Sequence, residues 1–385
     1  MTMLNMRLIQ SYRGYDDFAP RWMAARTWLK TGKSPYSAQM AAETQKLYEA
    51  NHFTVNEFDQ GRLTEPVFYV FLYLPFSALG FPLARAIWMT ILELCFVLSG
   101  WLAIQLSGIK LKALETVLFC ILIPLWYPFT KLILAASVVP PFIFMTLLAI
   151  RMAFQGKSSG AGILLFTCIL LVPVSIPIML FLVLYLGARR DTALIQIYLT
   201  GLVFLFVLAQ ILFPGWIVEW AGQFQRFHGD LSWIDTPLMR LAALVPSGQK
   251  TISIILHAAS FLYLLVEWYR LGSMNERQII WKLMLTLVIL YLFNLTSHAA
   301  YLLLIFPALF MIFRYLWEKW KIVGKIVSWL MFLGLMAIYW NRYLQIRAWH
   351  YQETALIILL VPIIAFIGLQ WFRWWATESP QPLVN

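Results

Sequence analysis

Apolar residues gather in long runs along most of the chain, whereas polar and apolar positions are mixed over residues 1–64. Many of the runs approach the roughly 20 residues that an α-helix needs to cross the hydrocarbon core of a bilayer. The pattern therefore predicts an all-α integral membrane protein. The expected apolar segments are 65–81, 84–106, 114–134, 136–154, 160–187, 193–213, 251–269, 279–295, 299–317, 325–340 and 354–375.

Two of these segments are irregular. Segment 65–81 is short, begins at Glu65-Pro66 and contains Pro75. Segment 160–187 is interrupted by PVSIP at 173–177, so we expect it to enter the membrane, break and return. Non-helical backbone at membrane depth is tolerated only where protein or a water-filled cavity surrounds it. The interruption therefore favours a functional cavity nearby.

Basic residues sort the loops into two sides. If 160–187 is re-entrant, thirteen Lys and Arg lie on one side, and six lie on the other from residue 114 onward. Cytoplasmic loops carry the excess of Lys and Arg, so the first side is predicted to be cytoplasmic, with the C-terminus. Residues 1–64 join the outer side only if 65–81 does not fully cross, and their eight Lys and Arg argue against export.

The same pattern divides the chain into parts. We expect a polar helical segment and candidate active site at 1–64, a first transmembrane bundle at 65–213 and an outer loop at 214–250. A second bundle at 251–375 and a tail at 376–385 complete the predicted organisation.

Composition supports a membrane protein and excludes other classes. The chain is 61% apolar and 12% charged, against about 45–50% and 25% in soluble domains. Basic cytoplasmic loops account for the net charge of +11, so nucleic acid is not an expected partner. The three cysteines lie inside apolar runs and are expected to be buried and unpaired. No metal-binding or nucleotide-binding motif is present, and neither a metal nor a cofactor is expected.

The polar segment predicts two helices. Asp16-Asp17 is a favourable N-cap, with Pro20 in the first turn and Gly32 as the stop. A second helix is expected near 38–50. A structural role for Asp17 is open at this point, because it could cap the first helix and pair with Arg21 four residues later.

The stretch DDFAPRWMAARTWLKTGKSPYS at 16–37 is similar to the first outer loop of glycosyltransferase family 87, in the multi-spanning GT-C class. EPVFYVFLYLPFSALGFPLARAIW at 65–88 and SHAAYLLLIFPA at 297–308 resemble later segments of that family. The positions that match the loop pattern are Asp17, Phe18, Ala24, Ala25, Gly32, Pro35 and Tyr36.

The resemblance implies a GT-C-like bundle of about 9–11 transmembrane segments with an N-terminal helical segment on the outer face. It implies transfer of a hexose or pentose from a polyprenyl-phosphate donor to a lipid or glycan acceptor at a prokaryotic plasma membrane. By this resemblance Asp17 is the general base of an inverting reaction, with Asp16 as its neighbour or substitute.

Further residues are candidates for binding the substrate, because cationic side chains can hold the leaving phosphate. Each of them could instead anchor the chain at the lipid headgroups. The candidates are Arg21, Tyr36, Arg62, Glu65, Arg226, His228, His298, Arg342, Arg347 and His350.

Two other functions are compatible with the sequence. An inactive GT-C-like subunit of a membrane complex is favoured by Val172-Pro173, where the family often has Lys-Pro, and by LAASVVPP at 134–141, where it often has Gly-Gln. No membrane helix precedes the Asp loop, which in the family usually has one. A transporter or lipid flippase is the second alternative, since broken helices also occur there.

Overall fold

The computed structural model describes residues 1–54, 61–168, 172–187, 189–228, 236–269, 271, 276–293, 299–346 and 355–377. Regular structure in these residues is helical, apart from one backbone bridge between Tyr15 and Thr54. The helices in chain order are α1 (Thr2–Ser11), α2 (Phe18–Thr31), α3 (Ala38–Asn51), α4 (Phe68–Ser77), α5 (Phe81–Ser107), α6 (Ala113–Leu122), η1 (Ile123–Leu125), α7 (Tyr127–Leu134), α8 (Val139–Phe154), α9 (Ser158–Thr167), α10 (Val172–Gly187), α11 (Ala193–Leu212), α12 (Trp216–His228), α13 (Pro237–Ala242), η3 (Pro246–Gly248), α14 (Gln249–Trp268), α15 (Glu276–Phe293), η5 (Ala299–Ile305), α16 (Phe306–Ile346), α17 (Ala355–Trp371) and α18 (Arg373–Thr377).

Several of these helices have the length and composition of membrane spans. Within the described ranges four are long and apolar enough, and a fifth is added if the bent pair of α6 and α7 counts as one span. Apolar side chains such as Val203 and Phe204 on α11 are exposed, at 63% and 61%. In water such a face would be costly, whereas in a bilayer it contacts lipid. The helices thus support the predicted helical membrane protein.

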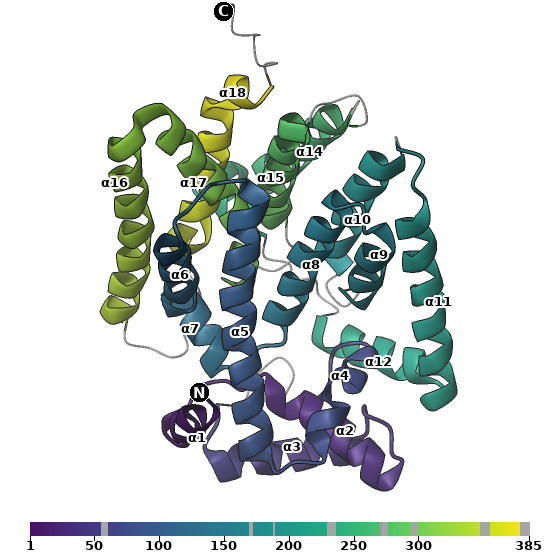
Figure 1. The fold of residues 1–385 in the computed structure, drawn as a ribbon. Coiled ribbons are helices and arrows are strands. Elements are labelled where there is room, and N and C mark those ends of the chain that lie inside the picture. The colour runs from purple at the N-terminus through teal and green to yellow at the C-terminus, as the bar shows by residue number, and fades with distance from the viewer. Residues whose placement is uncertain are drawn as a thin grey trace, which may run out of the picture.

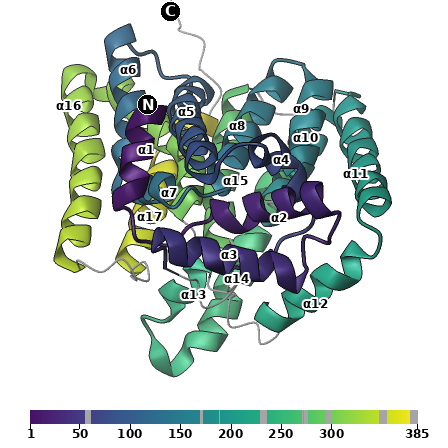
Figure 2. The same ribbon diagram turned by 90° about the horizontal axis from the view of Figure 1, so that it is seen from below.

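The N-terminal helices cover one end of the bundle. Helices α1 to α4 lie across the end at which α5 begins, and α5 runs from there to the opposite end (Figure 1). The view from below shows α2 and α3 lying across the other helices (Figure 2). We call this the covered end and the opposite one the far end.

Helix α4 does not cross the bundle. Its ten residues extend about 15 Å, half of the roughly 30 Å hydrocarbon core. Both of its ends are tied to the N-terminal helices: the Tyr36 hydroxyl donates to the Glu65 carbonyl at 2.8 Å, and Arg26 donates to the Ser77 carbonyl at 2.8 Å. Residues 1–54 therefore lie at the same end as the start of α5. The sequence had left open whether segment 65–81 crosses fully, and it does not.

Helix α12 lies at the covered end as well. The Trp220 indole N–H donates to the Thr64 carbonyl at 3.0 Å, and the Ser34 hydroxyl bonds the Glu219 carboxylate. The predicted outer loop and the N-terminal segment thus share one end of the molecule. The eight basic residues of 1–64 therefore join the six on the predicted outer side, against thirteen on the predicted cytoplasmic side. The cytoplasmic side then no longer carries an excess of Lys and Arg. Charge counts alone no longer orient the chain in the membrane.

The two ends of segment 160–187 lie close together, as the prediction of a re-entrant segment requires. The Ser158 hydroxyl at the start of α9 bonds the carboxylate of Asp191, which follows α10, so the segment enters and leaves at the same end. Helix α9 ends at Thr167 and α10 begins at Val172, so Pro173 lies in the first turn of α10, where a missing N–H costs little. On α9, a Cβ at Gly162 would meet the Leu194 carbonyl oxygen at 2.7 Å, so glycine permits close packing against α11.

Two more segments bend. The predicted span 114–134 bends by 61° between η1 and α7, where Pro124 and Pro128 each remove a backbone donor. Helix α16 reverses at Lys321, which has φ 47° and ψ −117°. Trp317 donates to the Ser328 hydroxyl at 3.0 Å, although eleven residues of straight helix would separate them by about 16 Å. The two segments predicted at 299–317 and 325–340 therefore form a hairpin.

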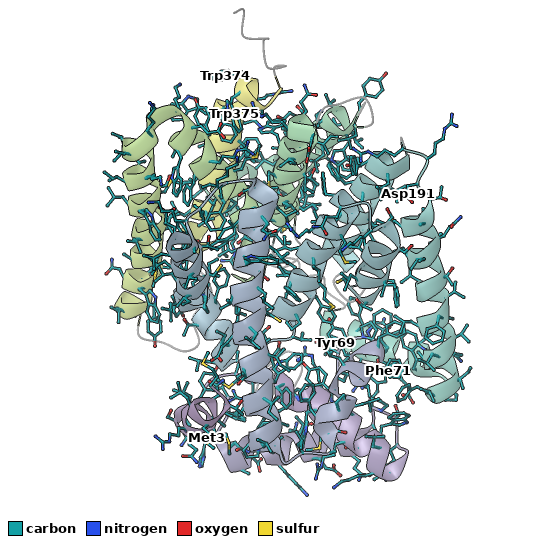
Figure 3. All side chains as sticks on the ribbon, in the orientation of Figure 1. Met3, Tyr69, Phe71, Asp191, Trp374 and Trp375 are labelled. Carbon is teal, nitrogen blue, oxygen red and sulfur yellow. The ribbon has the colours of Figure 1, made fainter. Side chains whose placement is uncertain are left out.

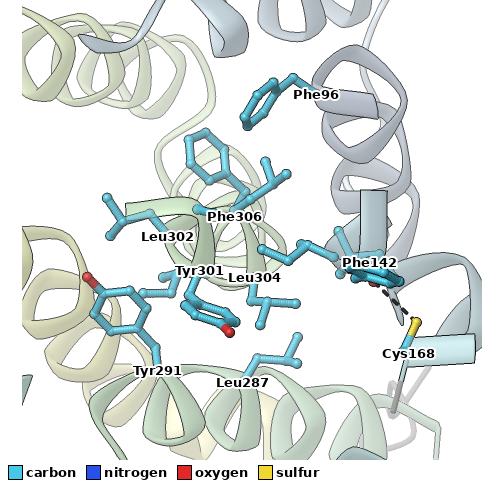
Figure 4. Packing of buried hydrophobic residues seen from close by; sticks show 14 of the residues in the cluster. Phe96, Phe142, Cys168, Leu287, Tyr291, Tyr301, Leu302, Leu304 and Phe306 are labelled. Atoms are coloured by element: carbon cyan, nitrogen blue, oxygen red, sulfur yellow. Dashed lines mark hydrogen bonds between the residues drawn. The ribbon is translucent and has the colours of Figure 1, made fainter. Parts of the chain in front are cut away.

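The core gathers around η5 and the start of α16. Figure 4 shows Tyr301, Leu304 and Phe306 packed between side chains of the neighbouring helices. The Phe306 ring centroid lies 5.2 Å from that of Trp126. In the same region the Cys168 thiol donates to the Phe142 carbonyl at 3.4 Å (Figure 4). All three cysteines are free and buried, as the sequence predicted.

Candidate functional site

The candidate site is a cluster of charged and phenolic side chains at the covered end. It begins at the start of α2, where the sequence predicted an N-cap. The N-cap position is Asp17, but its carboxylate makes no cap bond. Instead Asp16 accepts from the Ala19 backbone N–H at 2.7 Å. The capping role has therefore passed to Asp16, one residue earlier than expected.

Asp16 is also one half of a buried ion pair. Its second carboxylate oxygen bonds the Nε of Arg85 on α5, and both side chains have no exposed surface. Arg85 donates to the Leu134 carbonyl at 2.6 Å and lies 5.4 Å from the ring centre of Tyr12. Burial raises the pKa of Asp16, and the charge of Arg85 opposes that rise. The pair joins α2, α5 and α7, and Asp16 has no surface for a substrate in this arrangement.

Asp17 is held from several sides. Its Oδ1 accepts from the Tyr15 hydroxyl at 3.1 Å and from Arg21 at 2.8 Å, so the predicted i,i+4 pair is present. Its Oδ2 accepts from the Val138 N–H at 3.2 Å, at the beginning of α8, and its own N–H donates to the Ala135 carbonyl at 2.8 Å. A carboxylate there also complements the positive N-terminal end of α8. Asp17 thereby attaches α2 to the α7–α8 connection.

Arg21 bridges two carboxylates. One guanidinium nitrogen bonds Asp17, another bonds Glu65, and the group lies 5.7 Å from the ring centre of Tyr69. Burial opposes its charge, but the two acids raise the pKa of Arg21 well above its ordinary value. Its remaining Nε is buried and has no hydrogen-bond partner among the residues that the structure describes. Figure 3 places Tyr69 just inside the covered end, between the N-terminal helices and the bundle.

Glu65 is the most open acid of the cluster. Its side chain is 24% exposed, against 13% for Asp17. Its Oε1 bonds Arg21. The backbone carbonyl of Glu65 accepts a hydrogen bond from the Tyr36 hydroxyl. Burial raises the pKa of Tyr36. On α4, Tyr73 is fully buried, and its hydroxyl has no partner in the described part of the chain.

The structure brings together five of the predicted site residues: Asp16, Asp17, Arg21, Tyr36 and Glu65. The other predicted residues are more widely distributed. Arg62 is half-buried between α3 and α4, Arg226 is exposed on α12, and Arg342 is half-buried on the second part of α16. His298, Arg347 and His350 lie outside the described residues, as does the side chain of His228.

Sequence reasoning missed Arg85, Tyr73 and Tyr15. A charged residue five positions into an apolar helix is expensive unless paired, so Arg85 could have been singled out on that ground. Its partner could not be named, because Asp16 lies 69 residues away in the chain. Tyr73 carried no distinguishing feature, since phenols are common in apolar segments.

The cluster combines groups with two kinds of chemical capacity. A partly exposed carboxylate can accept a proton from a bound hydroxyl. Unsatisfied donors such as the Arg21 Nε–H and the Tyr73 hydroxyl can stabilise a developing negative charge. Buried polar groups without partners are uncommon in folded proteins and call for an explanation such as this one. No group of three metal-binding side chains occurs in the described part of the chain.

Comparison with known proteins adds no relative: no family description, no curated protein and no solved structure matches the chain.

Proposed function

We propose that the chain is a membrane glycosyltransferase with a GT-C-like bundle. It would move a sugar from a polyprenyl-phosphate donor to a lipid or glycan acceptor at the outer face of a prokaryotic plasma membrane. The eleven apolar segments expected from the sequence, the four or five described helices long enough to cross a membrane, and the resemblance of 16–37 to a family 87 loop support this proposal.

One observation carries the proposal. At the covered end, Arg21 holds two carboxylates in one cluster, of which Glu65 is 24% exposed, and the Arg21 Nε and the Tyr73 hydroxyl have no partner within the described residues. An inverting transfer from a lipid phosphate needs one proton acceptor and donors for the leaving phosphate, and it needs no nucleotide-binding fold. The cluster has a carboxylate that can accept the proton and donors that can bind the phosphate.

Glu65 suits the role of general base better than Asp17. Asp17 has both carboxylate oxygens engaged, one by Tyr15 and Arg21 and the other by the Val138 N–H. In the proposed reaction the acceptor oxygen attacks the anomeric carbon, and Glu65 takes its proton. The bond from that carbon to the phosphate oxygen breaks, and the phosphate leaves with the electron pair. Arg21 and Tyr73 donate to it, while Asp17 positions Arg21.

The test is release of polyprenyl phosphate from a panel of polyprenyl-phosphate sugars by the purified full chain in detergent. Glu65→Gln is expected to lower turnover about a hundredfold or more, which is typical for the loss of a general base. Glu43→Gln is the matched control, because Glu43 is a half-buried acid of α3 that bonds only Thr27 and Gln39. Asp17→Asn and Asp16→Asn complete the series, and a melting temperature is recorded for each variant.

The outcomes separate the residues from the function. Collapse in Asp17→Asn alone, with a wild-type melting temperature, would make Asp17 the base and leave the transferase standing. Equal turnover in Glu65→Gln, Asp17→Asn and wild type would remove both acids from the mechanism. Absence of turnover with every donor would overturn the transferase.

A non-catalytic binding subunit is the second candidate. It is favoured by the complete burial of Asp16 and by the engagement of both Asp17 oxygens, since these acids then serve to attach α2 to α5 and α8. For this function, a donor lipid would bind without being consumed.

A further inference from the structure

A second site of a different kind lies at the far end. A hollow of about 390 Å³ runs between the α16 hairpin and α17. Its walls are apolar, with Ile312, Met331 and Ile364 among them, and Gly368 sets the close approach of the two helices. A Cβ at Gly368 would meet the Cδ1 of Ile312 at 2.6 Å, so a larger residue would require the Ile312 side chain to shift.

The mouth of this groove has a different composition. Lys319 is the one charged residue among its described lining residues, and Trp320 and Trp371 are exposed at 42% and 69%. The Lys319 ammonium donates to the Tyr315 hydroxyl at 3.1 Å and lies 5.8 Å from the ring centre of Trp374. Figure 3 shows Trp374 at the far end of the molecule. Trp and Lys at the end of an apolar groove are typical of the bilayer interface.

Lys319 forms no ion pair within the described residues. Glu318, the adjacent acid, pairs with Arg314 at 2.8 Å. Lys319 is exposed, and its contacts within the described residues are to a phenol and to aromatic faces, which carry no negative charge to pair with it. An anion at the membrane surface would complete this environment.

An empty apolar groove in a bilayer is unfavourable, because its lining lacks dispersion contacts on one side. Water is a poor occupant of its apolar part, because a buried water needs two to four polar partners. A hollow of 390 Å³ falls within the range of ligand pockets, about 300–1,000 Å³. A flexible hydrocarbon chain entering from the surrounding lipid satisfies all of these conditions.

We propose that the groove between the α16 hairpin and α17 binds one acyl chain of an anionic phospholipid, whose phosphate contacts Lys319. The lipid comes from the leaflet at the far end, and its headgroup lies among Trp320, Trp371 and Trp374. The site is separate from the charged cluster at the covered end and does not depend on the glycosyltransferase proposal.

The test measures binding of labelled phosphatidylglycerol and phosphatidylcholine to the delipidated full chain in detergent. Wild type is expected to bind about one phosphatidylglycerol per chain with at least fivefold preference over phosphatidylcholine, the size of effect that one basic residue contributes at a membrane surface. Equal binding of the two lipids would overturn the anionic part of the proposal.

Two matched pairs of variants locate the site. Val327→Trp fills the groove, whereas Ile326→Trp, at an exposed neighbour outside the lining, is its control. We expect Val327→Trp to lower phosphatidylglycerol binding at least tenfold and Ile326→Trp to leave it unchanged. Lys319→Gln is expected to remove the preference for the anionic lipid, while Lys110→Gln, at the same end on the α5–α6 loop, retains it.

Melting temperatures identify variants that fail to fold. If Val327→Trp is folded and binds phosphatidylglycerol as wild type does, the groove is not the site. If Lys319→Gln keeps the preference, Lys319 does not contact the phosphate. Should Val327→Trp unfold, Met331→Trp, which fills the same groove from the second half of the hairpin, takes its place with the same expected loss.

Discussion

Two buried charge clusters lie at opposite ends of the molecule, and they differ in how completely their members are paired. At the far end, Glu267 is 3% exposed and bonds Lys282 at 2.9 Å through one oxygen and Arg373 at 2.6 Å through the other. The Lys282 ammonium also bonds the Glu267 backbone carbonyl. At the covered end, Arg21 and Tyr73 keep buried donor atoms without partners.

The difference separates a structural cluster from a candidate site. A buried charge is tolerated when its partners satisfy it, and the Glu267 cluster joins α14, α15 and α18 in this way. The covered-end cluster combines a fully paired part, Asp16 with Arg85, and an open part around Glu65. Incomplete pairing is a cost to stability that a binding or catalytic function would explain.

The largest expected effect concerns the two ends themselves. Lys33→Cys in the α2–α3 turn and Lys110→Cys in the α5–α6 turn should lie on opposite sides of the membrane. In whole cells a membrane-impermeant thiol reagent is expected to label the first variant, and the second only after permeabilisation. The three native cysteines are buried, so wild type measures the background. If both variants are labelled from the same side, the covered end and the far end do not lie on opposite sides of the membrane.

Next in size is the fully buried pair. Arg85→Met leaves Asp16 without its counter-charge and should cost about 3–5 kcal/mol of stability. The double variant Asp16→Leu with Arg85→Met should recover much of that loss, because both charges are gone. Thermal unfolding in detergent measures both. If Arg85→Met alone costs less than about 1 kcal/mol, the pair does not hold α2 against α5.

The two glutamates provide the sharpest contrast. Glu267→Gln leaves the buried Lys282 without an acid, so it should destabilise the chain by about 3 kcal/mol while turnover per folded molecule stays unchanged. Glu65→Gln should show the reverse, because Glu65 is partly exposed and its stability contribution is about 1 kcal/mol or less. Melting temperature and turnover, measured on the same samples, show whether each substitution affects stability or activity. The same pattern in both variants would remove the distinction between the clusters.

The smallest expected effect compares two tyrosines. Tyr48 donates to the Asp16 carbonyl at 3.1 Å, so Tyr48→Phe should cost about 1 kcal/mol. The Tyr73 hydroxyl is buried without a partner, so Tyr73→Phe should be neutral or slightly stabilising. In the turnover assay the order should reverse, with only Tyr73→Phe losing activity. A destabilising Tyr73→Phe would mean that its hydroxyl is satisfied after all.

Local features of the structure could be predicted from the sequence. Apolar runs determine helices because burial in lipid or protein requires every backbone group to bond within its own segment. The Asp17–Arg21 pair also follows from local geometry, since residues four apart share one face of a helix. PVSIP predicted that segment 160–187 is not one continuous helix, and the structure has two helices there, α9 and α10.

The tertiary structure alone decided which of these elements meet. Asp17 reaches Val138 across 121 residues, and Arg21 reaches Glu65 across 44. Such contacts depend on how whole helices pack, and no periodicity of either segment specifies them. Packing also assigned the cap to Asp16 instead of Asp17, and it left Glu65 as the open acid. The sequence by itself determined a membrane-embedded helical chain with a polar N-terminal segment, because hydropathy and helical period are local; the candidate site depends on distant groups, which only the fold brings together.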